Sequence, residues 1–210
     1  MEVGASNAKL RLPREAHHLT PIFKKWHDIN VEYCKAVDKD AVYWNTERVN
    51  VGALAAAVWL RHSQALEEFS AGRSFGRHQR QGRADLCFNW CGTDYVIEAK
   101  HEWVCLSPQA GDAAKRFDPA LKRARKAAVE SRYQGKRRLG IVFAVPYIHK
   151  QYADHSRPLV DKFLARLKEG VDYCAMCSVF PPPARRLQAR GHLFPGVVLL
   201  ARMPRRNLPR

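Results

Sequence analysis

The sequence predicts an α/β fold in which helices flank a mixed β-sheet, formed as a single domain of 210 residues. Three observations predict this class. Residues 47–62 carry apolar side chains at helical spacing, residues 84–101 alternate as strands do, and residues 139–145 form an uninterrupted apolar run. Because a strand that is apolar on both faces must be covered on both faces, this run indicates helices on each side of the sheet.

The N-terminal segments, up to about residue 39, are expected to lie outside the core of the fold. Residues 1–19 are polar and irregular, and they predict a flexible arm. From Thr20 to Lys39, apolar residues recur at roughly helical spacing, and Pro21 suits the first helical position. We therefore expect an extra N-terminal helix that packs its apolar face on the segments that follow.

A second helix is predicted to begin after Asn45 or Thr46 and to end near His62. Positions 47, 51, 54 and 58 share one face, so Glu47 is an acid at the N-terminal end of the stripe that should face the sheet. Two interpretations of Glu47 stay open. It either stabilises the helix N-terminus electrostatically or joins the acids of the next segments in a functional site.

Residues 65–70 are predicted to form the first strand of the core, with a continuation of the helix as the alternative, because short apolar runs suit both. A connection rich in glycine and arginine leads from there to Gly82. The arginines of this connection form a basic edge near the acids of the next segment, and we expect this edge to contact phosphates. They are Arg73, Arg77, Arg80 and Arg83.

The central feature is a predicted β-hairpin in residues 82–101. Asp85 projects from the less apolar face of its first strand. Glu98 and Lys100 project together from the second strand because they are two residues apart. The alternation therefore places two acids and a lysine on one face of the sheet.

The hairpin loop has two possible positions. A loop at Cys91-Gly92 sets Asp85 opposite Glu98, whereas a loop at Gly92-Thr93 sets Asp85 opposite Lys100. Carboxylates that meet across a sheet repel each other unless a cation or a proton lies between them, which favours a divalent-metal site beside a lysine. The simpler alternative is a ladder of surface ion pairs, which would stabilise the sheet by less than about 1 kcal/mol.

A long helix from Gly111 or Asp112 to Gln134 and a buried strand over 139–145 complete the core, and Pro146 is expected to end that strand. The helix is basic and has few acids, which favours contact with phosphates over a solvated face. The side chains expected to make such contacts are Lys115, Lys122, Arg125 and Lys126.

The remaining segments are predicted to extend the core. An amphipathic helix ends at Gly170, and two more strands follow over 173–180 and 195–201. Residues 204–210 form a basic tail that is expected to fray.

The charge composition indicates which class of partner the protein binds. The chain has 36 Lys and Arg against 20 Asp and Glu, a net charge of +16. This surplus indicates a polyanion, most simply nucleic acid, with an anionic membrane surface as the weaker alternative. No apolar run approaches the roughly 20 residues that span a bilayer, and the first thirty residues lack a signal-peptide core, so we expect a soluble, cytoplasmic protein that does not enter membranes.

Six cysteines in a chain long enough to build its own core predict mostly reduced, partly buried thiols rather than a disulfide scaffold. Cys174 and Cys177 have the spacing of a zinc knuckle, but no second pair of this kind accompanies them. Packing in the core is therefore the favoured interpretation of both.

The order of helix, three strands, helix and strand over 47–145 resembles the PD-(D/E)xK nuclease superfamily, which has the restriction-endonuclease-like fold. Asp85 matches the aspartate of the motif, and Glu98 and Lys100 match its (D/E)xK. Ala84 stands where the motif name has proline, but that proline is often absent in the family. The resemblance implies an α-β-β-β-α-β core with a mixed sheet, to which this chain adds an N-terminal helix and C-terminal strands.

The resemblance also implies a metal-dependent nuclease, most simply an endodeoxyribonuclease acting on DNA. Asp85, Glu98 and the carbonyl of Ala99 would hold Mg²⁺ or Mn²⁺. Lys100 would orient or deprotonate the attacking water, or stabilise the charge that develops on the phosphate. A bound metal polarises the phosphoryl oxygen and lowers the pKa of its water.

A fourth catalytic acid is expected from the same resemblance. Glu47 looks like the additional helix-borne glutamate of relatives such as Holliday-junction resolvases, Glu68 is the second candidate, and Glu67 the third. The alternative function is a nucleic-acid-binding protein that keeps this fold without the chemistry. RNA as the substrate and a homodimer as the assembly also stay open.

Overall fold

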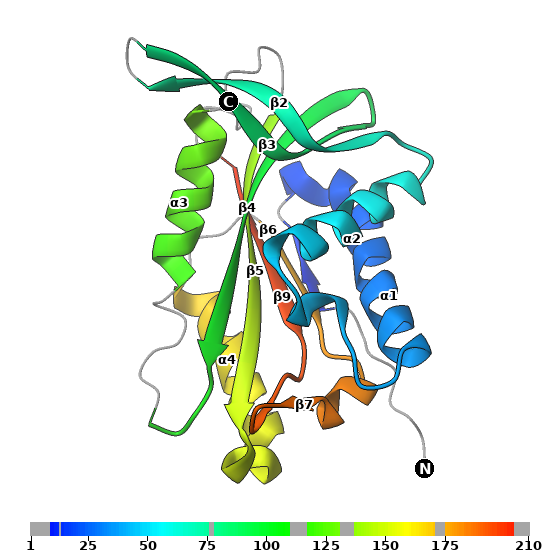
Figure 1. The fold of residues 1–210 in the computed structure, drawn as a ribbon, viewed down its shortest axis with the longest axis vertical. Helices are drawn as coiled ribbons and strands as arrows, with labels where there is room; N and C mark the ends of the chain where they lie inside the picture. The colour runs from blue at the N-terminus through cyan, green and yellow to red at the C-terminus, as the bar shows by residue number, and fades with distance from the viewer. Residues whose placement is uncertain are drawn as a thin grey trace.

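The computed structural model describes residues 9–12, 14–75, 78–109, 117–130, 137–170 and 175–203. Within these residues a mixed sheet lies between two layers of helices, which is the predicted α/β class (Figure 1). The main sheet has the strand order β1-β6-β9-β5-β4-β3-β2, and two short strands, β7 and β8, join it at β5.

The N-terminal segment is more ordered than the expected arm. Strand β1 (Lys9–Arg11) pairs antiparallel with β6 (Ala175–Val179), and a 3-10 helix, η1 (Arg14–Leu19), leads into α1 (Thr20–Ala36). Ala16 and Leu19 are 0% and 1% exposed. These two apolar side chains extend the buried face of α1 backwards, so residues 9–12 and 14–19 pack against the domain.

The second helix has the predicted position and buried face. A 3-10 turn, η2 (Val42–Trp44), precedes α2 (Glu47–Trp59), which follows extended backbone at Thr46. Val51, Leu54 and Val58 are buried, as the helical spacing predicts. The first turn of α2 therefore places Glu47 at the end of a stripe that faces the sheet.

Three long strands follow as an antiparallel meander: β2 (Ala65–Phe75), β3 (His78–Trp90) and β4 (Thr93–Cys105). Trp90 pairs with Thr93, so the loop is Cys91-Gly92, one of the two predicted registers. Both loop residues have positive φ, 49° and 71°, as a type I′ hairpin turn requires.

Helix α3 (Phe117–Glu130) connects β4 to β5 (Arg137–His149), which pairs parallel with β4. The prediction that Pro146 ends this strand is wrong, because β5 continues to His149. On its other edge β5 pairs with β9 (Val197–Arg202) as far as Ala144, and with β8 (His192–Leu193) from Ile148 onwards. Pro146 lies between those two ladders, where neither uses the amide hydrogen that proline lacks.

The C-terminal third adds the predicted helix and two strands. A 3-10 segment, η4 (Lys150–His155), precedes α4 (Ser156–Gly170), and β6 and β9 pair antiparallel beside β5. Another short turn, η5 (Pro183–Arg186), leads to β7 (Gln188–Ala189), which pairs with β8.

The sheet separates two apolar cores. On β5, Ile141 and Phe143 face α1 and α2, whereas Val142 and Ala144 face α3 and α4. This alternation is what a strand covered on both faces requires. Figure 1 shows the two helical layers, with α1 and α2 on one side and α3 and α4 on the other. Among the described residues, none of the helices combines the length and the apolar character needed to cross a bilayer.

Candidate functional site

Asp85 lies where β3 separates from β4 and where its pairing with β2 is interrupted by one residue pair. The ladder with β4 ends at Leu86 and Ile97, and the ladder with β2 omits Glu68 although it includes the residues on either side. Continuing the β2–β3 register and the β3–β4 register by one residue pair would place Glu68 and Glu98 on either side of Asp85. The backbones of these three acids are therefore neighbours across β2, β3 and β4, but only Glu68 and Asp85 line the cavity that faces α2.

The open edge of β4 holds two carboxylates through its own amide groups. The N–H of Ala99 donates to Asp85 Oδ2 at 2.6 Å, which replaces a backbone ladder bond with a side-chain bond. The N–H of His101 donates to the carboxylate of Glu47. Because alternate amides of a strand point to the same edge, Asp85 and Glu47 are bound about 7 Å apart along it.

Lys100 lies between Ala99 and His101, the two residues whose amides bind these acids, and its side chain reaches around the same edge. Its Nζ donates to the carbonyl of Ala99 and lies 3.5 Å from both carboxylate oxygens of Glu47. Both side chains are 35% exposed, so the ion pair itself stabilises the fold by less than about 1 kcal/mol. The ion pair that Lys100 makes is therefore a bridge from β4 to the start of α2, and not a rung of the alternative ladder between adjacent strands.

The pKa of Glu47 is raised above its ordinary value, and burial is the largest cause. The negative charge of Asp85 raises it further, whereas the ammonium of Lys100 and the amide of His101 lower it. The two carboxylates therefore repel each other in a half-buried setting, where added positive charge is stabilising.

Glu98 is buried beneath α3. It is 2% exposed, and it pairs in register with Gly140 of β5. A Cβ on Gly140 would lie 2.3 Å from the backbone nitrogen of Arg125 in α3, so the helix backbone covers this face of the sheet. Side chains of paired residues share a face, which places Glu98 on the α3 side.

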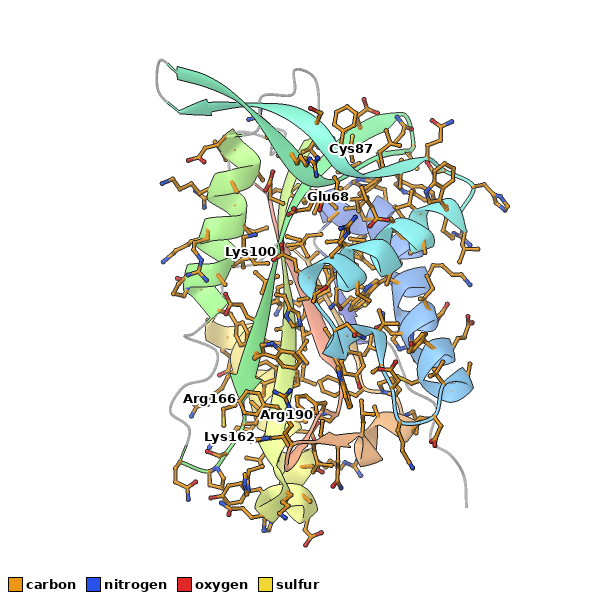
Figure 2. All side chains as sticks on the ribbon, viewed as in Figure 1. Glu68, Cys87, Lys100, Lys162, Arg166 and Arg190 are labelled. Carbon is orange, nitrogen blue, oxygen red and sulfur yellow. The ribbon has the colours of Figure 1, made fainter. Side chains whose placement is uncertain are left out.

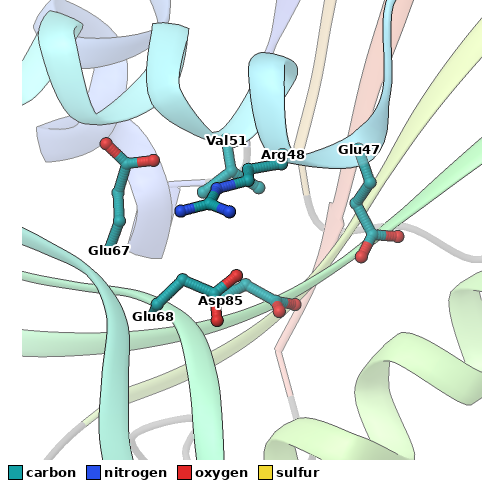
Figure 3. A pocket seen from close by; sticks show the side chains of 6 residues that line it. All are labelled: Glu47, Arg48, Val51, Glu67, Glu68 and Asp85. Carbon is teal, nitrogen blue, oxygen red and sulfur yellow. The ribbon is translucent and has the colours of Figure 1, made fainter.

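A cavity of about 40 Å³ opens beside Asp85, where α2 faces β2 and β3. This volume exceeds the roughly 10–15 Å³ that one water needs. Figure 3 shows the guanidinium of Arg48 turned into the space between Glu67 and the pair of Glu68 and Asp85. The lining consists of four acids, one base and one apolar side chain: Glu47, Arg48, Val51, Glu67, Glu68 and Asp85.

The backbone of Glu68 is strained. Its φ is +51°, in the left-handed region that a residue with a side chain occupies at a cost of about 1–2 kcal/mol. Its carboxylate lies 3.4 Å from Arg83 Nη1 and lines the cavity. Strain of this kind persists where surrounding structure imposes it, and it is common at functional sites.

These residues provide the oxygen donors that Mg²⁺ or Mn²⁺ prefers, but they are not gathered as a finished metal site. In the part of the chain that the structure describes, no three His, Cys, Asp or Glu side chains are grouped closely enough to hold a metal ion. Glu98 is not among the cavity residues, and the carbonyl of Ala99 accepts from Lys100. The donor chemistry fits such a cation, and the repulsion between Asp85 and Glu47 favours one.

The residues predicted to bind phosphate divide into three groups. Arg73 and Arg80 are opposite each other in the ladder of β2 and β3, whereas Arg77 and Lys115 lie outside the described residues. Arg83 is bonded to Glu68 at the edge of the cavity. The other three are on α3: Lys122, Arg125 and Lys126.

Acids balance more of the charge on α3 than the sequence suggested. Lys122 pairs with Asp118, and Lys126 pairs with Glu130 at 3.9 Å, both four residues apart. The expectation of a face almost without acids is therefore wrong for residues 117–130, because helical spacing brings the acids of each end to the lysines.

Sequence reasoning does not identify two parts of the site. One is Arg48, to which the helical pattern assigns no role, although a base in the first turn beside Glu47 indicates a place near the same acids. The other is the amide of His101, which gives no signal because a backbone donor leaves no trace in the sequence. The described cysteines are free thiols, as expected: Cys34, Cys87 and Cys177 are buried, Cys105 is partly buried and Cys91 is exposed, whereas Cys174 lies outside the described residues.

Comparisons with protein-family models, with curated proteins and with solved structures give no match for this chain.

Proposed function

We propose that this protein is a metal-dependent nuclease of the PD-(D/E)xK kind, which hydrolyses phosphodiester bonds of DNA at the open edge of β4. One observation carries the proposal: Asp85 and Glu47 accept from alternate amides of that edge, with Lys100 between them. A structural ladder gains little from such an arrangement, whereas hydrolysis of a phosphodiester needs acids, a cation and a positioned donor within reach of one phosphate.

The order of elements supports the same proposal. Helix α2, strands β2, β3 and β4, helix α3 and strand β5 follow one another as the restriction-endonuclease-like core requires, and β5 is parallel to β4. In this proposal Asp85 lies where β3 separates from β4, and α2 adds Glu47 from the helical layer that covers this face.

Each residue has a distinct role in the proposed reaction. Asp85 and Glu68, which line the same cavity, would hold Mg²⁺ or Mn²⁺, which when bound polarises the phosphoryl oxygen and lowers the pKa of water. Glu98 lies outside the cavity and the carbonyl of Ala99 accepts from Lys100, so these two ligands that the motif implies would have to be rearranged to join them. Lys100 donates to the phosphate as negative charge develops on it. Glu47, whose pKa is raised, accepts the proton of the attacking water more readily than an ordinary carboxylate.

Cleavage of supercoiled and linear DNA with and without Mg²⁺ tests the proposal. We expect Asp85→Asn, which keeps an acceptor for the Ala99 amide, and Lys100→Ala to lower the rate by about 10²–10⁴-fold. Glu169→Gln and Lys168→Ala, which are exposed in the last turn of α4, make the same charge changes away from the site and should retain activity.

Thermal unfolding gives a second measurement that needs no turnover. Mn²⁺ at ten times its dissociation constant should stabilise the wild type by about 1.4 kcal/mol. Asp85→Asn should reduce this effect, and Glu169→Gln should not. Equal cleavage by all four variants would sink the proposal. DNA binding without cleavage, unchanged by chelation and by Asp85→Asn, would instead favour the non-catalytic nucleic-acid-binding protein.

A further inference from the structure

A row of aromatic rings begins beside the candidate site and follows the sheet away from it. His101 packs edge-on against Trp103 at 4.9 Å between ring centroids, and Trp103 packs against Phe194 at 5.5 Å. Phe194 also contacts rings from two other elements. The aromatic row consists of Trp44, His101, Trp103, Tyr147, His192 and Phe194.

The row lies on one face of the sheet. His101 and Trp103 pair in register with Phe143 and Val145, two residues of the core under α1 and α2. Helix α2 ends its cover of the sheet at Glu47, which the amide of His101 binds. The rings therefore begin directly next to the proposed catalytic acid, where η2 continues the cover: His101 Nε2 lies 3.4 Å from the carbonyl of Tyr43, and the Tyr43 hydroxyl donates to the carbonyl of Phe194.

These rings are accessible to a ligand. Trp103 is 46% exposed and is the most open ring, whereas the other five are partly exposed. Two of these five, Trp44 and Phe194, also pack against the core beneath α1 and α2. The imidazole of His101 is the more enclosed end, and burial lowers its pKa, which favours the neutral ring. A series of accessible rings at successive spacings of 4.9–6.4 Å is more than the single exposed aromatic that a surface ordinarily shows.

Basic side chains are available at the far end. The amide of Lys150 donates to the carbonyl of Gly191 at 2.9 Å, which holds Lys150 beside the turn that contains Arg190. Both side chains are exposed. Figure 2 shows Lys100 midway along the sheet and Arg190 near its lower end, so cations lie at both ends of the row.

We propose that the aromatic row binds an unpaired DNA strand that leads to or from the scissile phosphate, with bases stacked on the rings and phosphates near Lys150 and Arg190. Intact duplex hides the faces of its bases, so exposed rings contribute only when nucleotides are unpaired. This inference rests on the proposed nuclease function, and it specifies the substrate as DNA with a single-stranded segment, such as a flap, a gap or a free end.

The test measures binding in a chelator, where cleavage plays no part. The probe is labelled oligothymidylate of about 10 nucleotides, within the usual site sizes. Trp103→Leu removes the aromatic face but keeps an apolar side chain, and Trp103→Phe keeps both. We expect Trp103→Leu to weaken binding by about 5- to 150-fold, equivalent to about 1–3 kcal/mol for one stacked base, and Trp103→Phe to retain most of it.

Controls separate stacking from general charge attraction. Trp59→Leu removes a tryptophan that is 54% exposed at the end of α2 and should not change binding. Trp103→Leu should leave the affinity for heparin and for blunt duplex unchanged. It should also leave the salt dependence unchanged, whereas Arg190→Gln should reduce the slope of log affinity against log salt by about 0.7.

Several results would overturn the inference. The first is an equal loss of oligothymidylate affinity in Trp103→Leu and Trp59→Leu. The second is equal affinity of the Trp103→Leu and Trp103→Phe variants for oligothymidylate. The third is tighter binding of the matching oligoribonucleotide than of DNA. Failure of the proposed function is a separate result, because it appears as no Mg²⁺-dependent cleavage by a wild type that still binds oligothymidylate through Trp103.

Discussion

The strained backbone at Glu68 predicts an unusual response to glycine. Glycine adopts a φ of +51° without steric cost, so Glu68→Gly relieves about 1–2 kcal/mol of strain. Against this, glycine in a strand costs about 0.5–1 kcal/mol in chain entropy, and the exposed pair with Arg83 contributes less than about 1 kcal/mol. We therefore expect Glu68→Gly to leave the free energy of unfolding nearly unchanged or slightly raised.

Glu67→Gly is the matched control, because Glu67 is also an exposed acid of β2 and has no positive φ. It bears the entropy cost without relief of strain, so it should be less stable than Glu68→Gly by about 1–2 kcal/mol, or about 2–8 °C in Tm. Glu68→Gln keeps the strain and removes the charge, and it should unfold like the wild type. Urea and thermal unfolding measure all three, and equal destabilisation by Glu67→Gly and Glu68→Gly would refute the assignment of strain.

Two further predictions concern stability away from the cavity. Gly140→Ala should destabilise the protein by about 3 kcal/mol, because its Cβ would lie 2.3 Å from the rigid backbone of α3. Gly92→Ala, whose Cβ would have nothing within 4 Å, should cost only about 1 kcal/mol of turn strain. Urea unfolding measures both losses of stability, and equal losses would contradict the close approach at Gly140. Burial raises the pKa of the Cys177 thiol to about 12 from 9.0. Because the folded state resists thiolate formation, stability falls as pH rises above 9, so the stability difference between wild type and Cys177→Ala should shrink by about 1.4 kcal/mol from pH 7 to pH 10.

Local periodicity predicted much of the fold. The alternation around Asp85 and Glu98 and the spacing after Glu47 depend only on neighbours in the chain, and each element appears where that spacing placed it. Turn chemistry also reduced the hairpin to two registers, of which Cys91-Gly92 is the one formed. These features need no knowledge of distant contacts.

The details that shape the candidate site depend on distant contacts. Glu98 becomes buried because Gly140, far along the chain, lets the α3 backbone approach. Pro146 stays within a strand because two separate ladders end on either side of it. The segment near Leu19 is ordered because β1 pairs with β6, which lies more than 150 residues away. Sequence patterns do not encode which residues meet over such separations.

The opening of β3 from β4 links the two proposals. If the ladder continued past Leu86 and Ile97, the amides of Ala99 and His101 would bond to backbone carbonyls, and neither Asp85 nor Glu47 would have its present donor. Among the described residues, the same departure leaves this edge of β4 without a paired strand beside the start of the aromatic row. A strand bound along that row would meet the His101 end next to Glu47 and Lys100, so the break in pairing that assembles the acids also gives an unpaired strand its approach to them.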